Sequence, residues 1–144
     1  MLAQPLTLPC GAVLPNRLAK AAMTEGLADP LGRPTAELEQ LYRVWGAGGC
    51  GMLLSGNVQV DRDHLERPGN VILDRPADGA MIDALRRWTG AAKANGSAFW
   101  AQISHAGRQT MKPVNPHPKA PSAVKLGLPG GQFGEPVALT EAEI

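Results

Sequence analysis

Side chains that can form hydrogen bonds are concentrated at the end of one predicted strand. Residues 102–109 contain five of them, and Gly107 would allow a close approach of the backbone to a ligand. The five are Gln102, Ser104, His105, Arg108 and Gln109. The amide of Gln102 carries a donor and an acceptor, which suits a ligand edge on which acceptors and donors alternate. The same groups could instead cap the strand and brace the following loop, and the residues alone leave both interpretations open.

A second candidate is the glycine-rich string at residues 46–51, which matches the GxGxxG pattern of dinucleotide sites. In such sites the string follows a strand and opens a helix, so that amides at the helix N-terminus meet the pyrophosphate. Here the string follows a predicted helix and leads into a strand. We therefore interpret it as a helix end and a tight turn.

Metal-ligating residue types gather in one predicted loop. Asp61, Asp63 and His64 could suggest a metal site, but their spacing matches no known ligand set. Neighbouring Arg62 and Arg67 would compete for the carboxylates. We therefore favour a solvated loop with local ion pairs and predict no metal site.

The elements that must position these residues alternate along the chain. Apolar side chains in residues 35–47 follow the spacing of one helix face, with Thr35 as the N-cap and Gly48-Gly49 as the stop. The predicted elements are strands at residues 18–23, 51–58 and 97–103 and helices at residues 35–47 and 77–94. This β-α-β-α-β order predicts parallel strands joined by right-handed crossovers.

The lengths of the predicted loops differ between the two ends of the strands. The helix-to-strand connections are only Gly48-Gly49 and Asn95-Gly96, whereas the loops that follow the strands are long, at residues 24–34, 59–75 and 104–140. Parallel α/β folds build their sites from the loops at the C-terminal ends of the strands. The pattern therefore favours an enzyme scaffold over a structural module.

We predict that residues 1–144 form one incomplete α/β domain. Its predicted parts are a small hairpin at residues 1–17, the β-α-β-α-β core at 18–104, a long loop at 105–139, and the start of a truncated helix at 140–144. A complete (β/α)8 barrel takes about 250 residues. We therefore predict the N-terminal portion of a TIM barrel, with about three β/α units after the hairpin.

The composition excludes several classes of protein. With 14 basic and 13 acidic residues, the chain lacks the basic excess that nucleic-acid or anionic-membrane surfaces need. Its apolar runs are shorter than the roughly 20 residues of a membrane span, and no export signal is visible. Cys10 and Cys50 have no CxxC spacing and no evident base nearby, so we expect reduced buried or turn thiols. These features predict a cytoplasmic protein.

Short motifs along the whole chain resemble the N-terminal part of the old yellow enzyme family, the NADH:flavin oxidoreductases with an FMN-binding (β/α)8 barrel. Each motif is weak alone, but their order and spacing together are specific. They are Pro15-Asn16-Arg17, Ala22-Met23-Thr24-Glu25, Gly32-Arg33-Pro34-Thr35, Ser55-Gly56-Asn57, Arg67-Pro68-Gly69-Asn70, Gln102, Ser104-His105-Ala106-Gly107-Arg108-Gln109, Ala120-Pro121-Ser122 and Ala138-Leu139-Thr140.

The resemblance implies roles for individual residues at an FMN site. The backbone of Ala22 and Met23 would line the flavin, and Thr24 would lie beside its C4 carbonyl. Gly56 and Asn57 fall where relatives keep the second strand close to the flavin, although relatives often carry Ala or Gly in place of Asn57. Gln102 would bond the pyrimidine edge of the ring. His105 and Arg108 are expected to brace the structure.

The resemblance also implies an activity, in which NAD(P)H reduces FMN and the flavin passes hydride to an activated alkene. No catalytic residue is expected within this segment, because the pair that polarises the substrate belongs to the fourth strand, after residue 144. Two alternatives stay open: a flavin barrel with other chemistry, such as amine or dienoyl-thioester oxidoreduction, and a non-catalytic truncated fragment. The expected partners are a small-molecule substrate and, through exposed strand edges, another copy of the chain.

Overall fold

The computed structural model describes all residues 1–144, and its centre is a parallel sheet. The sheet contains β3 (Ala19–Lys20), β4 (Met52–Gln59) and β6 (Ala98–Ser104), with β4 paired to both of the others. A fourth short strand, β5 (Val71–Ile72), extends the sheet beside the last residues of β4. The predicted parallel sheet is therefore confirmed, and β3 and β6 each pair with the sheet along one edge only.

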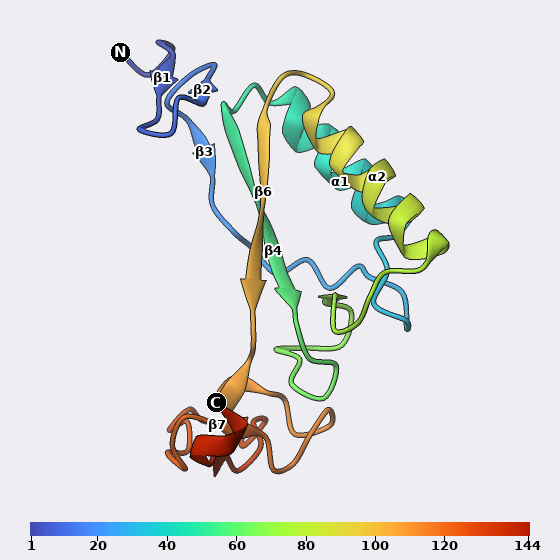
Figure 1. Ribbon diagram of the computed structural model, residues 1–144, viewed down its shortest axis with the longest axis vertical. Coiled ribbons are helices and arrows are strands. Elements are labelled where there is room, and N and C mark those ends of the chain that lie inside the picture. Colours follow the sequence, from blue (N-terminus) through green and yellow to red (C-terminus); the bar gives the residue numbers. More distant parts are fainter.

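Two helices cover one face of this sheet (Figure 1). α1 (Ala36–Ala47) begins at Thr35, whose side chain accepts a hydrogen bond from the backbone N–H of Leu38. α2 (Gly79–Lys93) is capped in the same way by Asp78, which accepts from the N–H of Met81. Both caps satisfy amides that have no partner inside the helix, which fixes where each helix begins.

The core lies between these helices and the sheet, and Tyr42 is at its centre. The ring of Tyr42 meets those of Trp45, Trp88 and Phe99 edge to face, with centroids 5.0–5.3 Å apart. The buried members of the cluster are Leu38, Tyr42, Leu53, Val58, Val71, Trp88 and Ala92. Such aromatic contacts add to the free energy gained from burial alone. The core thus holds β4, β6 and both helices together.

The glycine-rich string at residues 46–51 serves the packing of this core. A Cβ on Gly46 would lie 2.8 Å from the carbonyl oxygen of Ala92, so the glycine lets α1 and α2 approach closely. Gly48 caps α1, and Gly49 turns the chain with a φ of +79°. The interpretation as a helix end and a tight turn is confirmed.

The two ends of the chain form small separate elements. The N-terminal hairpin pairs β1 (Leu6–Thr7) with β2 (Val13–Leu14), as predicted, while the first sheet strand is shorter than the predicted residues 18–23. The stretch predicted as a long loop contains a 3-10 turn, η1 (Gly107–Gln109), and the parallel pair β7 (Lys119–Ala120) and β8 (Val137–Ala138). The last residues form a second 3-10 turn, η2 (Glu141–Glu143), with a capping box between Thr140 and Glu143.

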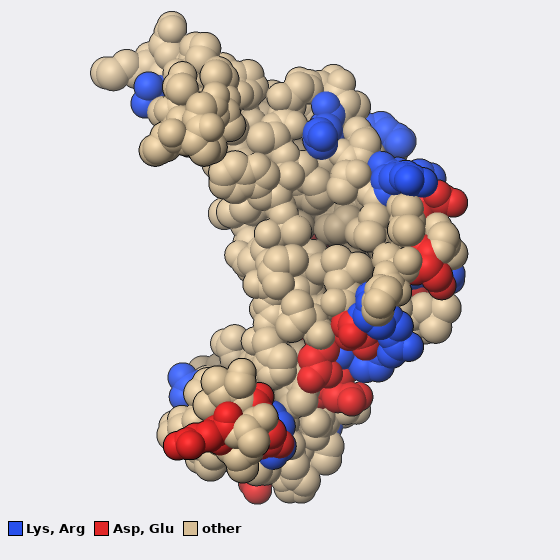
Figure 2. All heavy atoms as spheres, viewed as in Figure 1, with Lys and Arg blue, Asp and Glu red and all other residues tan.

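The sheet face opposite the helices is open. Because Phe99 packs against the core, Trp100 and Gln102 must point to the other side of β6. Trp100 is 47% exposed. In Figure 2 the charged side chains gather on the helix side and around the C-terminal end, and the concave side shows almost none. No helix in the structure is both long enough and apolar enough to cross a membrane.

Candidate functional site

The C-terminal ends of β4 and β6 bring together two of the predicted site residues, Asn57 and Gln102. These residues are direct partners in the register of the two strands, and the Nε2 of Gln102 donates to the Oδ1 of Asn57 at 2.6 Å. The register shifts between Leu54 and Asn57, and the backbone N–H of Gln102 donates to the Oγ of Ser55 at 2.9 Å across this irregularity. A bulge of this kind re-aims side chains at a strand end.

A carboxylate links this pair to the third predicted polar residue. The Oγ1 of Thr24 donates to the Oε2 of Glu66 at 2.6 Å, and the Nδ2 of Asn57 donates to the same oxygen at 3.2 Å. Thr24, Glu66, Asn57 and Gln102 therefore form one hydrogen-bonded chain, which we call the strand-end network. It joins the loop after β3, the loop after β4, and the ends of β4 and β6.

Sequence reasoning missed Glu66. The residue lies in the long loop after β4, beside Arg67, whose Nε is 3.5 Å from the other carboxylate oxygen. Its side chain is only 24% exposed, which is low for a charged group in a loop. No spacing pattern marks it, and the only available signal was its position after a parallel strand, where sites are built.

Gly56 allows the segment after β3 to lie directly against β4. A Cβ at this position would be 2.2 Å from the Oε2 of Glu25 and 2.3 Å from the carbonyl oxygen of Met23. The Oε1 of Glu25 accepts hydrogen bonds from the Gly56 N–H at 3.1 Å and from the Tyr42 hydroxyl at 2.5 Å. Burial, followed by the adjacent Glu25 carboxylate, raises the pKa of Tyr42 far above its usual value. The Tyr42 hydroxyl therefore stays protonated and donates its hydrogen bond to Glu25.

The predicted site residues differ in how much of each faces solvent. Ala22 and Thr24 are half-buried, Gly56 is buried, and Asn57 is half-buried. Met23 is 50% exposed and Gln102 is also exposed. An apolar side chain and an amide are thus both accessible to a ligand near the strand ends.

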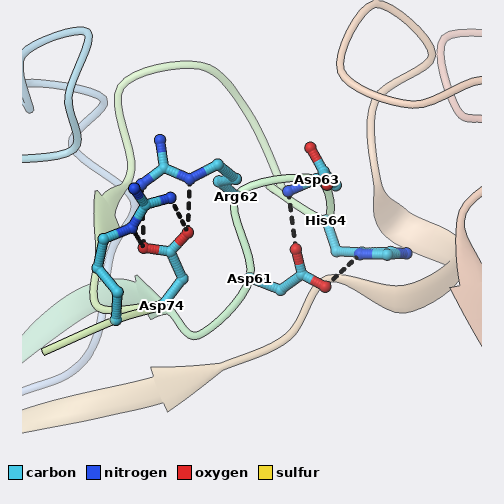
Figure 3. Close-up of polar contacts among 6 residues, drawn as sticks. Asp61, Arg62, Asp63, His64 and Asp74 are labelled. Carbon is cyan, nitrogen blue, oxygen red and sulfur yellow. Dashed lines mark hydrogen bonds and ion pairs between the residues drawn. The ribbon is translucent and has the colours of Figure 1, made fainter. Parts of the chain in front are cut away.

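Two of the predicted metal-type residues, Asp61 and His64, form a separate cluster with His105, and Figure 3 shows these two. The Nδ1 of His64 lies 2.7 Å from the Oδ2 of Asp61, and its Nε2 accepts from the backbone N–H of Lys119 at 2.8 Å. The ring of His105 stacks on that of His64 with centroids 4.5 Å apart. Both nitrogens of His64 are therefore occupied, and the ring ties the loop after β4 to β7.

Two details of this loop differ from the sequence-based interpretation. His64 is buried, with 7% of its surface exposed, so its part of the loop is not solvated. Arg62 pairs with Asp74 through two hydrogen bonds of 2.5 and 3.0 Å (Figure 3), and not with Asp61 or Asp63. No local pattern in the sequence indicates this pairing, because Asp74 comes close to Arg62 only after β5 pairs with the end of β4.

The charges of the cluster are coupled. Burial opposes ionisation of Asp61, but hydrogen bonds from the Asp63 N–H and the His64 ring outweigh it and lower the pKa of Asp61. Burial, with the neighbouring His64, lowers the pKa of His105. His105 also accepts from the N–H of Gly107 at 3.1 Å. The contacts of His105 are those of a residue that braces the start of the C-terminal segment.

Comparison with known proteins relates the chain to flavin enzymes, although a scan of protein-family profiles finds no match. The NADH-dependent flavin oxidoreductase nadA of Aspergillus parasiticus is 40% identical over 141 residues, covering 90% of the chain and 32% of that protein. The enzyme of the same description, iliE of Neonectria sp., is 38% identical over 140 residues, covering 93% of the chain and 18% of that protein. The chain thus spans a third or less of the length of these relatives.

Solved structures give the same result for the fold. The old yellow enzyme homologue from Zymomonas mobilis superimposes with a TM-score of 0.80 at 23% identity, over 99% of the chain and 40% of that structure. Morphinone reductase gives a TM-score of 0.77 at 25% identity, again over 99% of the chain and 40% of that structure. The predicted partial barrel is therefore confirmed. Over nearly its whole length the chain is thus similar to a part of NADH-dependent flavin oxidoreductases, and its fold is that of an N-terminal part of the old yellow enzyme barrel.

Proposed function

We propose that the chain supplies the flavin-ring side of an FMN site in an NAD(P)H oxidoreductase of the ene-reductase type. The observation that carries this proposal is that five of the six predicted site residues lie close together near the C-terminal ends of three parallel strands. The five are Met23, Thr24, Gly56, Asn57 and Gln102, and Ala22 directly precedes Met23 in the chain. Parallel α/β folds build their sites at this end of the strands.

The residues present fit an isoalloxazine ring by their chemistry. The ring is flat, uncharged in its oxidised form, and carries carbonyl and N–H groups along its pyrimidine edge. Near the strand ends Met23 is half-exposed and the amide of Gln102 is exposed, and these can match an apolar surface and a polar edge respectively. Gly56 keeps the Met23 backbone against β4, so that the surface for the ring is held by two strands.

Bound FMN would supply the hydride chemistry, between NAD(P)H and an activated alkene. The contribution of this chain is to bind and orient. Ala22 and Met23 would line the ring, and Gln102 would hold its pyrimidine edge. The groups that polarise the alkene, and those that hold the FMN phosphate, are expected outside these 144 residues. We therefore expect weak flavin binding and no alkene reduction from these residues alone.

Nuclear magnetic resonance with the 15N-labelled chain tests the proposal, because it detects weak binding. FMN and riboflavin, titrated separately, should both shift the backbone amides of Met23 and Thr24 and the side-chain amide of Gln102. Riboflavin should act like FMN because these residues would meet the ring and not the phosphate. If the chain is folded but none of its amide resonances shifts with either ligand at millimolar concentration, the proposed function is contradicted.

The matched variants are Gln102→Ala and Gln132→Ala. Gln132 is exposed and remote from the strand ends in sequence and in pairing, so its loss should leave the titration unchanged. Loss of the Gln102 amide should weaken flavin binding by roughly 1–3 kcal/mol, which is about 5- to 150-fold. Equal effects of the two substitutions would remove Gln102 from the site.

A further inference from the structure

We infer that Glu66 is a positioning residue that selects which hydrogen-bonding pattern Gln102 presents to a bound ring. The inference rests on the proposed function for the identity of the ring. Its starting point is the strand-end network, in which Glu66 accepts from Thr24 and Asn57 and Asn57 accepts from Gln102.

The direction of each hydrogen bond in this network follows from the carboxylate. An ionised carboxylate can only accept, so Asn57 must turn its NH2 group towards Glu66 and its Oδ1 towards Gln102. Gln102 must then turn its own NH2 group towards Asn57, as the 2.6 Å contact shows. The Oε1 of Gln102 and its second N–H are therefore free to meet a ligand. An acceptor and a donor are presented side by side.

Without the carboxylate the opposite arrangement becomes available. Asn57 could turn its NH2 group towards Gln102, and the Oε1 of Gln102 would then accept that bond. Gln102 would present only N–H donors to the ligand. Glu66 thus favours a ring edge on which a carbonyl stands beside an N–H, and disfavours an edge that carries acceptors alone. In oxidised flavin the N–H of the pyrimidine edge is that of N3.

Thr24 is constrained by the same carboxylate. Its single hydroxyl proton is used in the 2.6 Å hydrogen bond to Glu66. The hydroxyl oxygen can therefore only accept a hydrogen bond from any other neighbouring group. Half-burial of Glu66 strengthens this preference, because few water molecules can replace Thr24 as a donor. A hydrogen bond from Thr24 to the flavin C4 carbonyl, beside which the resemblance places it, would therefore compete with the bond to Glu66.

The experiment compares riboflavin with N3-methylriboflavin, in which the N–H of the pyrimidine edge is absent. The wild-type chain should prefer riboflavin by about three- to tenfold, as loss of one hydrogen bond predicts. In Glu66→Leu this ratio should fall, because both orientations of Gln102 become accessible. The methyl group has the same size in every variant, so a change in the ratio reports the hydrogen-bond direction and not its bulk.

Two further variants separate the possible outcomes. Glu66→Gln retains a carbonyl oxygen for Thr24 and Asn57 and should keep most of the preference for riboflavin. Glu141→Leu, in the exposed turn η2, should behave as wild type. A ratio that is unchanged in Glu66→Leu would overturn the inference, and so would equal losses in Glu66→Gln and Glu66→Leu.

The ligand-free spectra distinguish failure of this inference from failure of the proposed function. Glu66→Leu should shift the side-chain amide resonances of Asn57 and Gln102 without any flavin, and Glu141→Leu should not. If these resonances respond but neither flavin binds, Glu66 positions the amides and the flavin assignment is wrong. If they do not respond, the positioning role of Glu66 is rejected whatever binds.

Discussion

Two regions of the sheet, the face covered by helices and the C-terminal ends of the strands, are held together by different interactions. Between the sheet and the helices, Tyr42, Trp88 and Phe99 pack in a closed aromatic cluster. At the strand ends the four side chains of the strand-end network are joined by hydrogen bonds, and Gln102 remains exposed. Burial gives the first region its stability, whereas the second gains little from burial and keeps free donors and acceptors. The fold and the site can therefore be altered separately.

The strongest test of this separation is Trp88→Ala. Trp88 is 2% exposed and its indole N–H has no hydrogen-bond partner, so its contribution to stability is packing alone. The substitution should lower the free energy of unfolding by about 3–5 kcal/mol. Urea unfolding followed by circular dichroism measures this change. In contrast, Gln102→Ala should leave the midpoint nearly unchanged, and a comparable loss there would show that the two regions are not separable.

Gly56→Ala should affect both regions at once. The added Cβ would meet the Glu25 carboxylate and the Met23 carbonyl at distances that no Cβ tolerates, so the segment after β3 must move. We expect a destabilisation of about 1–3 kcal/mol from this overpacking, together with loss of flavin-induced shifts at Met23.

The matched control is Gly90→Ala in α2, where a Cβ would meet nothing within 4 Å. This change should stabilise the helix by about 0.5–1 kcal/mol, because alanine loses less backbone freedom on folding. Thermal unfolding of both variants measures the difference. Similar stabilities for the two would refute the close approach of the segment after β3 to β4 at Gly56.

Thr24→Val tests the polar region with a smaller effect. The substitution keeps the shape of the side chain but removes the donor to Glu66, so we expect a loss of about 0.5–1.5 kcal/mol. Chemical unfolding compared with Thr7→Val, a substitution in the exposed part of the hairpin, isolates the lost hydrogen bond. If the Thr24 and Thr7 variants are equally stable, the hydroxyl contributes nothing to the network.

The smallest predicted effect concerns acid and the loop after β4. The pKa of Asp61 is lowered in the folded state, so its contribution to stability is present above its unfolded pKa of about 3.9 and is lost as the pH falls through the folded value. Asp61→Asn should therefore reduce stability at neutral pH and converge with wild type in acid. Urea unfolding between pH 3 and pH 7 measures this, with Asp63→Asn as a control that removes an exposed carboxylate. A constant difference across this range would contradict the prediction.

The sequence predicted the packed region better than the polar one. Helix caps such as Thr35 and apolar spacing such as that of Leu38 and Tyr42 depend on residues close together in the chain, and they are confirmed. The order of the elements was sufficient to infer that Asn57 and Gln102 lie near the C-terminal ends of parallel strands. Local patterns could thus place the ends of strands but not the side chains of their loops.

The missed features all depend on the path of a loop. Glu66 is nine residues beyond Asn57, and its bond to Thr24 spans 42 residues. Arg62 forms its ion pair with Asp74 only because β5 pairs with the end of β4. The short strands β7 and β8 were not predicted, because two-residue strands carry no readable alternation. In each case the backbone must be placed before the partner can be known.

The one-sided pairing of β6 has a consequence for hydrogen–deuterium exchange. Successive backbone amides of a strand point to opposite edges, so along β6 those directed at β4 should exchange slowly and the intervening ones quickly. β4, which is paired on both sides over part of its length, should show no such alternation there. The exchange rates of alternate amides in β6 therefore report whether its free edge is paired. Any segment that adds a strand to the free edge would slow the fast amides and leave the slow ones unchanged.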